Sequence, residues 1–187
     1  MADFEIAYRK LLKYEGIYSN DSDDKGGETY KGISRVYHPD WEGWEIIDKA
    51  KREKQDLSNL KEVEGLVKSF YKKNYWDYFS LDRVPQLIGE EIFEIAVNCG
   101  IKRTTLIIQQ SVNLLNRNQA LYSDVLEDGI WGEKTLAALF SCFRYNGVNV
   151  LFNVLNILQG CHYINLMRTN PKYEKFIGWF NRIEIYK

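Results

Sequence analysis

The sequence predicts a mainly α-helical fold with a small β-hairpin element near residues 25–36. Over most of the 187 residues, apolar side chains recur at the three- and four-residue spacing that gathers them on one face of a helix. Residues 16–34 break this period with glycine, serine and acidic residues, which favour turns and short strands. The length fits one domain, or two contiguous lobes that share a core.

The first helix is expected over residues 3–15, where the apolar side chains follow helical spacing. Asp3 suits the N-cap position, and Gly16 lies just past the last turn. A small antiparallel hairpin is then expected around Gly26 and Gly27, because glycine adopts the backbone angles of tight turns. Its strands would carry Thr29, Tyr30 and Ile33.

The rest of the chain is expected to be helical. Helical spacing continues in six further segments, at about 43–55, 59–79, 85–97, 102–116, 132–144 and 148–167. A last amphipathic segment covers roughly residues 171–184. No repeat, low-complexity tract or flexible linker separates the two halves of the sequence.

Charge and hydropathy exclude several classes of protein. The formal net charge of −1 argues against general electrostatic binding to nucleic acid. Residues 49–73 are rich in lysine, which is usual for a solvated helix face; contact with an anionic polymer is the alternative. The N-terminus carries charges throughout, unlike a secretion signal, and no apolar run is long enough to span a membrane. We therefore expect synthesis in the cytoplasm without a signal peptide, followed by release through another route.

Cysteine and histidine offer little chemistry in this sequence. Cys99, Cys142 and Cys161 each lie among apolar residues and form no CxxC pair, so buried reduced thiols are expected. A disulfide or a nucleophilic thiol is the alternative. His38 and His162 lie in unrelated contexts, and the common nucleotide-binding, zinc-protease and serine-hydrolase motifs are absent from the sequence. No metal site and no cofactor is expected.

Carboxylates remain as the candidates for catalysis. Glu15 ends the first predicted helix, and Asp21, Asp23 and Asp24 follow in a polar loop. Glycoside hydrolysis uses one protonated carboxylic acid and one carboxylate that activates water or attacks the sugar. A Glu shielded by apolar neighbours has a raised pKa, whereas an Asp in a wet loop stays ionised, as these two roles require. From the residues alone, an exposed helix end, a solvated turn and a loose calcium loop remain alternatives.

Aromatic residues are abundant, with 13 Tyr, 9 Phe and 5 Trp. Trp131 and Trp179 lie in apolar, helical surroundings. We expect both to pack in the core, and stacking on sugar rings is the alternative.

Several motifs resemble a known family. Residues 14–21 (YEGIYSND) and 24–34 (DKGGETYKGIS) resemble the N-terminal signature of the glycoside hydrolase family 108 N-acetylmuramidases, roughly E-G-G-Y-x-N-D-P-x-D-x-G-G-x-T-x-x-G-I. Residues 178–182 (GWFNR) resemble a closing G-W-x-N-R of the same family. The intervening predicted peptidoglycan-binding region is matched by Asn98, Gly100, Arg103, Gln109 or Gln110, residues 128–132 (DGIWG) and Thr135.

The resemblance implies a lysozyme-like fold and hydrolysis of the bond between N-acetylmuramic acid and N-acetylglucosamine in bacterial peptidoglycan. It places the catalytic glutamate of the family on Glu15, the aspartate before the glycine pair on Asp24 and the following threonine on Thr29. Three further residues are assigned to substrate binding: Asp21, Tyr30 and Asn98.

The chain departs from the signature at three positions. Ile17 stands at the second glycine of E-G-G and Ser22 at the proline of N-D-P. Tyr30 follows Thr29 where asparagine is common, which changes the contacts expected in the sugar cleft. Gly16 keeps the turn after the catalytic glutamate.

The resemblance also divides the chain into a hydrolase region, residues 1–92, and a helical peptidoglycan-binding region, residues 93–187, packed as one lysozyme-like body. The expected partners are peptidoglycan glycan strands and a holin or a secretion apparatus. Some members of the family are called secretion activators, and several resemble phage or prophage endolysins. The expected place of action is the cell wall or periplasm.

The sequence-based hypothesis is a peptidoglycan hydrolase in which Glu15 protonates the glycosidic oxygen. Asp24, helped by Thr29, positions water or stabilises the developing oxocarbenium charge, and Asp21 competes for this role. The alternative is a non-catalytic wall-binding or secretion-assisting protein. Such a protein has no chemical need for an acid at Glu15, so the three residues together favour the enzyme. Nucleic-acid binding is a third hypothesis, and it rests only on the lysine-rich segment.

Overall fold

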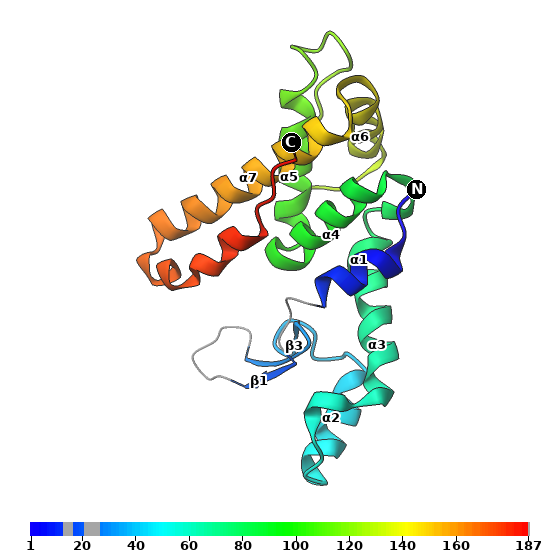
Figure 1. Ribbon diagram of the computed structural model, residues 1–187, viewed down its shortest axis with the longest axis vertical. Helices are drawn as coiled ribbons and strands as arrows, with labels where there is room; N and C mark the ends of the chain where they lie inside the picture. Colours follow the sequence, from blue (N-terminus) through cyan, green and yellow to red (C-terminus); the bar gives the residue numbers. More distant parts are fainter. Residues whose placement is uncertain (13–16, 21–26, 187) are drawn as a thin grey trace. The chain divides into compact units, whose positions relative to one another are not determined.

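The computed structural model describes residues 1–12, 17–20 and 27–186, and it is mainly helical with one small antiparallel sheet (Figure 1). The predicted fold class is therefore confirmed. The chain divides into two compact units, Phe4–Tyr78 and Met1–Asp3 with Phe79–Lys187, which we call the N-terminal and C-terminal units. The boundary expected near residue 92 stays a prediction.

In its described residues, the N-terminal unit holds the sheet and three α-helices. Its elements, in chain order, are α1 (Phe4–Leu11), β1 (Tyr18–Asn20), β2 (Glu28–Tyr30), β3 (Ile33–Ser34), α2 (Gly43–Arg52), the 3₁₀ turn η1 (Leu57–Asn59), α3 (Lys61–Tyr71) and the π turn η2 (Lys72–Trp76).

The sheet is antiparallel in the order β1-β2-β3. A two-residue turn joins β2 to β3, with Lys31 at φ 44° and Gly32 at φ 79°. Positive φ at both positions is the signature of a turn whose twist matches that of a hairpin. The predicted β element is thus present, but its tight turn lies at Lys31–Gly32, and β1 adds a strand that the sequence did not predict.

The core of the N-terminal unit forms where α1 meets α3. The buried side chains of α1 follow helical spacing: Phe4, Ala7, Tyr8 and Leu11. The ring of Tyr8 lies 6.0 Å from that of Tyr71, measured between centroids. The π turn η2 is closed by a 2.8 Å hydrogen bond from the Asp77 N–H to the Lys72 carbonyl. It carries buried Trp76, whose ring lies 5.5 Å from that of Phe4, measured between centroids.

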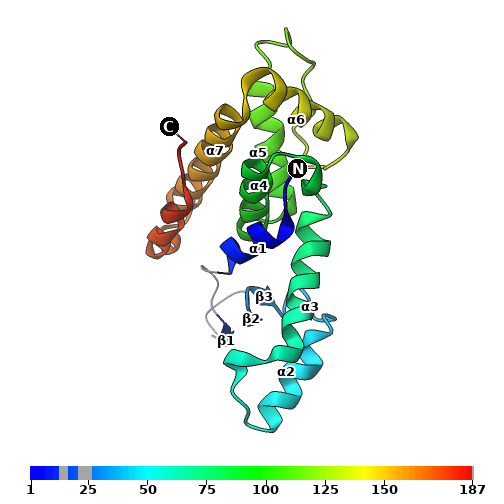
Figure 2. The same cartoon turned by 45° about the vertical axis from the view of Figure 1, so that its right-hand side comes forward.

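The C-terminal unit is a helical assembly built around one long helix. Its elements are η3 (Leu81–Arg83), α4 (Gln86–Cys99), α5 (Ile101–Leu114), α6 (Glu133–Asn146), α7 (Val148–Thr169) and the kinked 3₁₀ segment η4 (Pro171–Arg182). Helix α7 contacts α4, α5, α6 and η4. Figures 1 and 2 both show the red η4 folding back along the orange end of α7.

Several expectations about single residues need correction. Cys142 is buried and Cys99 half-buried, but Cys161 is exposed, so the expectation of a buried thiol is wrong for this residue. All three are free thiols. Trp131 and Trp179 are half-buried rather than enclosed in a core. In the part of the chain that the structure describes, no helix is both long and apolar enough to cross a membrane.

Candidate functional site

The structure places some of the predicted site residues and not others. Glu15, Asp21 and Asp24 lie outside the described residues. Thr29 and Tyr30 are neighbours on β2 in the N-terminal unit, whereas Asn98 is an exposed residue of α4 in the C-terminal unit. The described part of the predicted catalytic set is therefore Thr29 and the sheet that carries it.

Thr29 lies on a face of the sheet lined by hydroxyl groups. Its cross-strand partners are Ser19 on β1 and Ser34 on β3, so the three side chains share one face. Thr29 is half-buried, and its hydroxyl donates to the Gly27 carbonyl at 3.2 Å. A row of hydroxyls on a small sheet suits hydrogen bonding to water or sugar.

Tyr30 points to the opposite face, because side chains alternate along a strand. It is fully buried, with 0% of its surface exposed. Its burial supports the sheet on the core of the unit. The burial of Tyr30 does not support the role in substrate binding that was expected for it, and this role stays a prediction.

An ionic cluster that the sequence reasoning missed surrounds Glu28. The Tyr18 hydroxyl donates to Glu28 Oε1 at 3.0 Å and Lys51 Nζ donates to the same oxygen at 2.7 Å. Arg35 Nη1 donates to Oε2 at 2.9 Å. Arg35 also forms a bidentate pair with Asp48 of α2, at 2.8 and 2.6 Å. The cluster ties β1, β2 and the turn after β3 to α2.

The cluster fixes the protonation state of Glu28. Burial raises the pKa of this carboxyl, but the hydrogen bonds from Lys51, Arg35 and Tyr18 outweigh it, so the pKa lies below its ordinary value. A carboxylate held as an anion does not suit the role of a general acid, although Glu28 is the direct neighbour of Thr29. The sequence does carry one indication that Glu28 has a structural role. Glu28 precedes buried Tyr30 by two residues, so both side chains lie on the same face of the strand.

A second set of contacts holds the β2–β3 turn against α3. The Tyr71 hydroxyl donates to the Lys31 carbonyl at 2.7 Å, and Lys31 Nζ pairs with the Glu64 carboxylate. The sheet is therefore attached to both α2 and α3. Such attachment gives the Thr29 face a defined position within the N-terminal unit.

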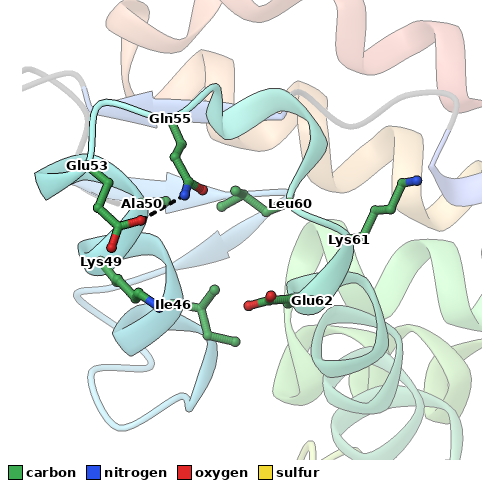
Figure 3. A pocket seen from close by; sticks show the side chains of 8 residues that line it. All are labelled: Ile46, Lys49, Ala50, Glu53, Gln55, Leu60, Lys61 and Glu62. Atoms are coloured by element: carbon green, nitrogen blue, oxygen red, sulfur yellow. Dashed lines mark hydrogen bonds between the residues drawn. The ribbon is translucent and has the colours of Figure 1, made fainter.

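A cavity of about 280 Å³ opens between α2, η1 and the start of α3 (Figure 3). Its apolar wall is formed by Ile46, Ala50 and Leu60, and its rim carries Lys49, Glu53, Gln55, Lys61 and Glu62. The charges on the rim are of both signs, and Gln55 is already hydrogen-bonded to Glu53 at 2.8 Å. None of the described residues that the sequence assigns to the site lines this cavity.

Asn98 takes part in a polar network of the C-terminal unit. Its Nδ2 donates to the carbonyl and to Oε1 of Glu94, both at 2.8 Å. Glu94 also accepts from Gln159 of α7 at 2.8 Å and from Arg182 of η4 at 2.9 Å. Asn98 and the Arg182 of the GWFNR motif therefore meet at one carboxylate, which links α4, α7 and η4.

The DGIWG motif is organised by buried Gln109. This side chain donates to Asp128 Oδ1 at 2.9 Å and accepts from the Gly129 N–H at 2.9 Å. The sequence left Gln109 and Gln110 as alternatives for the match to the family, and Gln109 is the one that contacts the DGIWG loop. The motif thus shapes a loop, and half-buried Trp131 from it packs on Phe79 with 5.0 Å between ring centroids.

An aromatic cluster lies on η4 and the facing side of α7. Phe176 and Trp179 stack with 5.1 Å between centroids and 7° between ring planes. Trp179 also contacts Tyr163 and Tyr173, at 5.2 and 6.0 Å. Phe176 is 39% exposed. Partly exposed stacked rings of this kind are suited to the apolar faces of sugars.

Within the described ranges, no group of three or more His, Cys, Asp or Glu side chains is arranged to hold a metal ion. Glu28 and Asp48, the acidic residues of the sheet cluster, are both paired with cations of the chain. The described site therefore offers hydroxyl groups and fixed ion pairs.

Most of the chain is similar to known protein families. Residues 8–100 match the family described as "Glycosyl hydrolase 108", and residues 104–184 match the "Predicted Peptidoglycan domain". A solved structure, that of Brucella abortus SagA, is similar in fold with a TM-score of 0.68 and 23% sequence identity, over 96% of this chain and 88% of that chain. No curated protein matches the sequence.

Proposed function

Starting from the finding that the chain belongs to the glycosyl hydrolase 108 family and carries the predicted peptidoglycan domain behind it, we propose that it is an N-acetylmuramidase. It would cleave the bond between N-acetylmuramic acid and N-acetylglucosamine in peptidoglycan. The observation that carries the proposal is the pairing of a glycosidase region with a peptidoglycan region in one chain. The glycosidase match spans Glu15, Asp24 and Thr29.

The proposed mechanism gives each of these residues one task. Glu15 donates its proton to the glycosidic oxygen as the bond to the anomeric carbon breaks. Asp24, as a carboxylate, orients the attacking water or stabilises the positive charge that develops on the sugar. Thr29 supports this step from the hydroxyl-lined face of the sheet. Water supplies the hydroxyl of the new reducing end, and its remaining proton restores the acid.

Mass analysis of digested peptidoglycan tests the proposal. Purified walls are incubated with the protein, and the soluble fragments are reduced with borohydride before analysis. Fragments that end in reduced N-acetylmuramic acid support the muramidase. Fragments that end in reduced N-acetylglucosamine, or a complete lack of soluble sugar fragments, would reject it.

The same digest separates the enzyme from its rival, a wall-binding or secretion-assisting protein without catalysis. The predicted peptidoglycan domain over residues 104–184 favours wall attachment in either case. A protein that sediments with walls but releases no fragments is the rival. Release of fragments by the wild type and not by Glu15→Gln identifies the enzyme.

The proposed substrate sets the proposed place of action. Peptidoglycan lies outside the cytoplasmic membrane, so the protein would act at the cell wall or in the periplasm after release from the cytoplasm. Passage through a holin pore or a secretion apparatus stays a prediction. Fractionation of cells that produce a tagged form would test it, and tag confined to the cytoplasm until lysis would contradict a dedicated export route.

A further inference from the structure

The C-terminal unit contains a cavity that none of the described residues assigned to the site lines. It has a volume of about 380 Å³ and lies between α5 and α7, which contact each other (Figures 1 and 2). Helix α5 contributes three residues at one-turn spacing: Arg103, Ile107 and Gln110. Helix α7 contributes Leu158, Cys161, His162, Asn165, Leu166 and Thr169.

The lining combines an apolar floor with one positive charge and several uncharged polar side chains. Ile107, Leu158 and Leu166 supply the aliphatic surface. Arg103 brings a permanent positive charge, and no acidic side chain is among the described residues of the lining. Burial lowers the pKa of His162, and the nearby charge of Arg103 lowers it further, so this imidazole is neutral near pH 7. The cavity therefore favours an anionic group.

The polar groups at this cavity are available for a ligand. In the described part of the chain, the side chains of Arg103, Gln110 and Asn165 form no hydrogen bond or ion pair. Thr169, by contrast, donates its hydroxyl to the Asn165 and Leu166 carbonyls, at 2.8 and 3.1 Å. A guanidinium with two amide side chains is a donor set that matches the oxygens of a carboxylate.

We propose that the α5–α7 cavity binds the carboxylate of a short peptide of the kind attached to peptidoglycan glycan strands, a proposal that rests on the proposed function. Arg103 pairs with the carboxylate, Gln110 and Asn165 bind the peptide groups, and the aliphatic floor takes small apolar side chains. A sugar ring is the less suitable occupant, because no Trp, Tyr or Phe is among the described lining residues. The stacked aromatic rings lie on η4 instead.

The test uses muramyl dipeptide as the probe, since it carries one free carboxylate on a peptide and has no bond between two sugars to cleave. It is titrated into the full-length protein, and amide chemical shifts and calorimetry follow binding. We expect shifts at residues of α5 and α7, and Arg103→Gln should weaken binding about tenfold or more, because a hydrogen-bonded charge is lost. Arg144→Gln, which removes an exposed arginine on α6, should leave binding unchanged.

One further probe and one further variant make the result specific. Muramyl dipeptide with its carboxylate converted to an amide should bind no better to the wild type than the acid binds to Arg103→Gln. Asn165→Leu tests the amide contacts separately, and unchanged melting temperatures show that the variants are folded. Equal binding by Arg103→Gln and wild type, or equal binding of acid and amide, would overturn the proposal.

Failure of this proposal and failure of the proposed function give different results. If the protein cleaves walls but does not bind the probe, the proposed muramidase activity stands and the proposed peptide binding by the cavity is rejected. If the protein binds the probe through Arg103 but cleaves no walls, the proposed role of the cavity stands and the proposed muramidase activity is rejected.

Discussion

The acidic residues around the small sheet differ in what they can do chemically. Glu28 is adjacent to Thr29, but Lys51 and Arg35 hold it as an anion. Asp48 is likewise held by a bidentate arginine. A general acid must carry a proton near the working pH, so neither residue suits that role. Because neither Glu28 nor Asp48 suits the role of general acid, the proposal that Glu15 is the acid gains support. The ionic cluster is then expected to position the sheet.

Glu15→Gln is expected to lower the rate of clearing of purified cell walls by about 10²- to 10⁴-fold, which is the usual contribution of a general acid. The amide cannot donate a proton to the glycosidic oxygen. Turbidity of a wall suspension gives the rate, and circular dichroism confirms the fold. Full activity in the folded variant would show that Glu15 is not the acid.

Asp24 and Asp21 are distinguished by the same assay. Asp24→Asn is expected to reduce the clearing rate more than Asp21→Asn, because the proposed mechanism gives the second carboxylate role to Asp24, which directly precedes the Lys25-Gly26-Gly27 segment of the signature. The two changes remove the same charge at positions three residues apart in the sequence, so each controls for the other. Equal activity in both variants would remove Asp24 from the site.

Glu28→Gln should lower the free energy of unfolding by about 1–2 kcal/mol near neutral pH, because the variant leaves Lys51 without its anion and weakens the bond from Arg35. The pKa of Glu28 is lowered by folding, so its stabilisation is complete above the unfolded value of about 4.5 and declines as the pH falls through the folded value. Urea unfolding at several pH values measures both effects.

The matched control for this change is Glu45→Gln on the exposed surface of α2. It should alter stability by less than about 0.5 kcal/mol. The difference between wild type and Glu28→Gln should shrink on acidification. A constant difference across acidic pH would show that the charge of Glu28 is not what stabilises the sheet.

At the scale of elements, periodicity predicted the helices well because their buried faces are continuous. The segments expected at 85–97 and 148–167 appear as Gln86–Cys99 and Val148–Thr169. Glycines with positive φ, at Gly100 and Gly147, mark the breaks between neighbouring helices. Local sequence is sufficient here, because spacing and breakers act within a few residues.

Elements that depend on distant partners were not predictable in the same way. The β1 strand forms because its backbone pairs with β2, and the 3₁₀ geometry of η4 accompanies aromatic packing onto α7. Single hydrogen bonds in the Glu28 cluster link residues up to 23 positions apart, and a motif search does not relate them. Of the candidate site, Thr29 was found by its motif, whereas the residues that hold its sheet appear only in three dimensions.

The loop of the DGIWG motif offers a test of local geometry. Gly129 has φ +71°, and an added Cβ would lie 2.8 Å from Lys102 Cγ and 3.1 Å from the Lys102 carbonyl oxygen. Gly129→Ala should therefore lower the free energy of unfolding by more than about 1 kcal/mol. Gly65→Ala, at an exposed helical position with open space around it, should instead raise it by about 0.5–1 kcal/mol. Opposite signs in thermal unfolding are the expected result, and a neutral Gly129→Ala would contradict the strain argument.

At the scale of the whole molecule, a net charge of −1 gives little general attraction to an anionic wall. Attachment must then come from local surfaces, and the matched regions divide the tasks. The glycosidase match covers residues 8–100, whereas the η4 aromatic cluster falls inside the peptidoglycan match over residues 104–184. Wall retention and bond cleavage should therefore respond to different substitutions.

Phe176→Ala is expected to weaken retention on insoluble peptidoglycan about threefold to tenfold, since it removes the exposed ring of the Phe176–Trp179 stack. Cleavage of short soluble glycan fragments should change little, because such fragments do not depend on attachment to a wall. Ile177→Ala is the matched control: Ile177 is 73% exposed and apolar but has no ring to stack. Sedimentation with purified walls measures retention in both variants. Equal retention by Phe176→Ala and wild type, or equal loss in both variants, would show that η4 does not hold glycan by aromatic stacking.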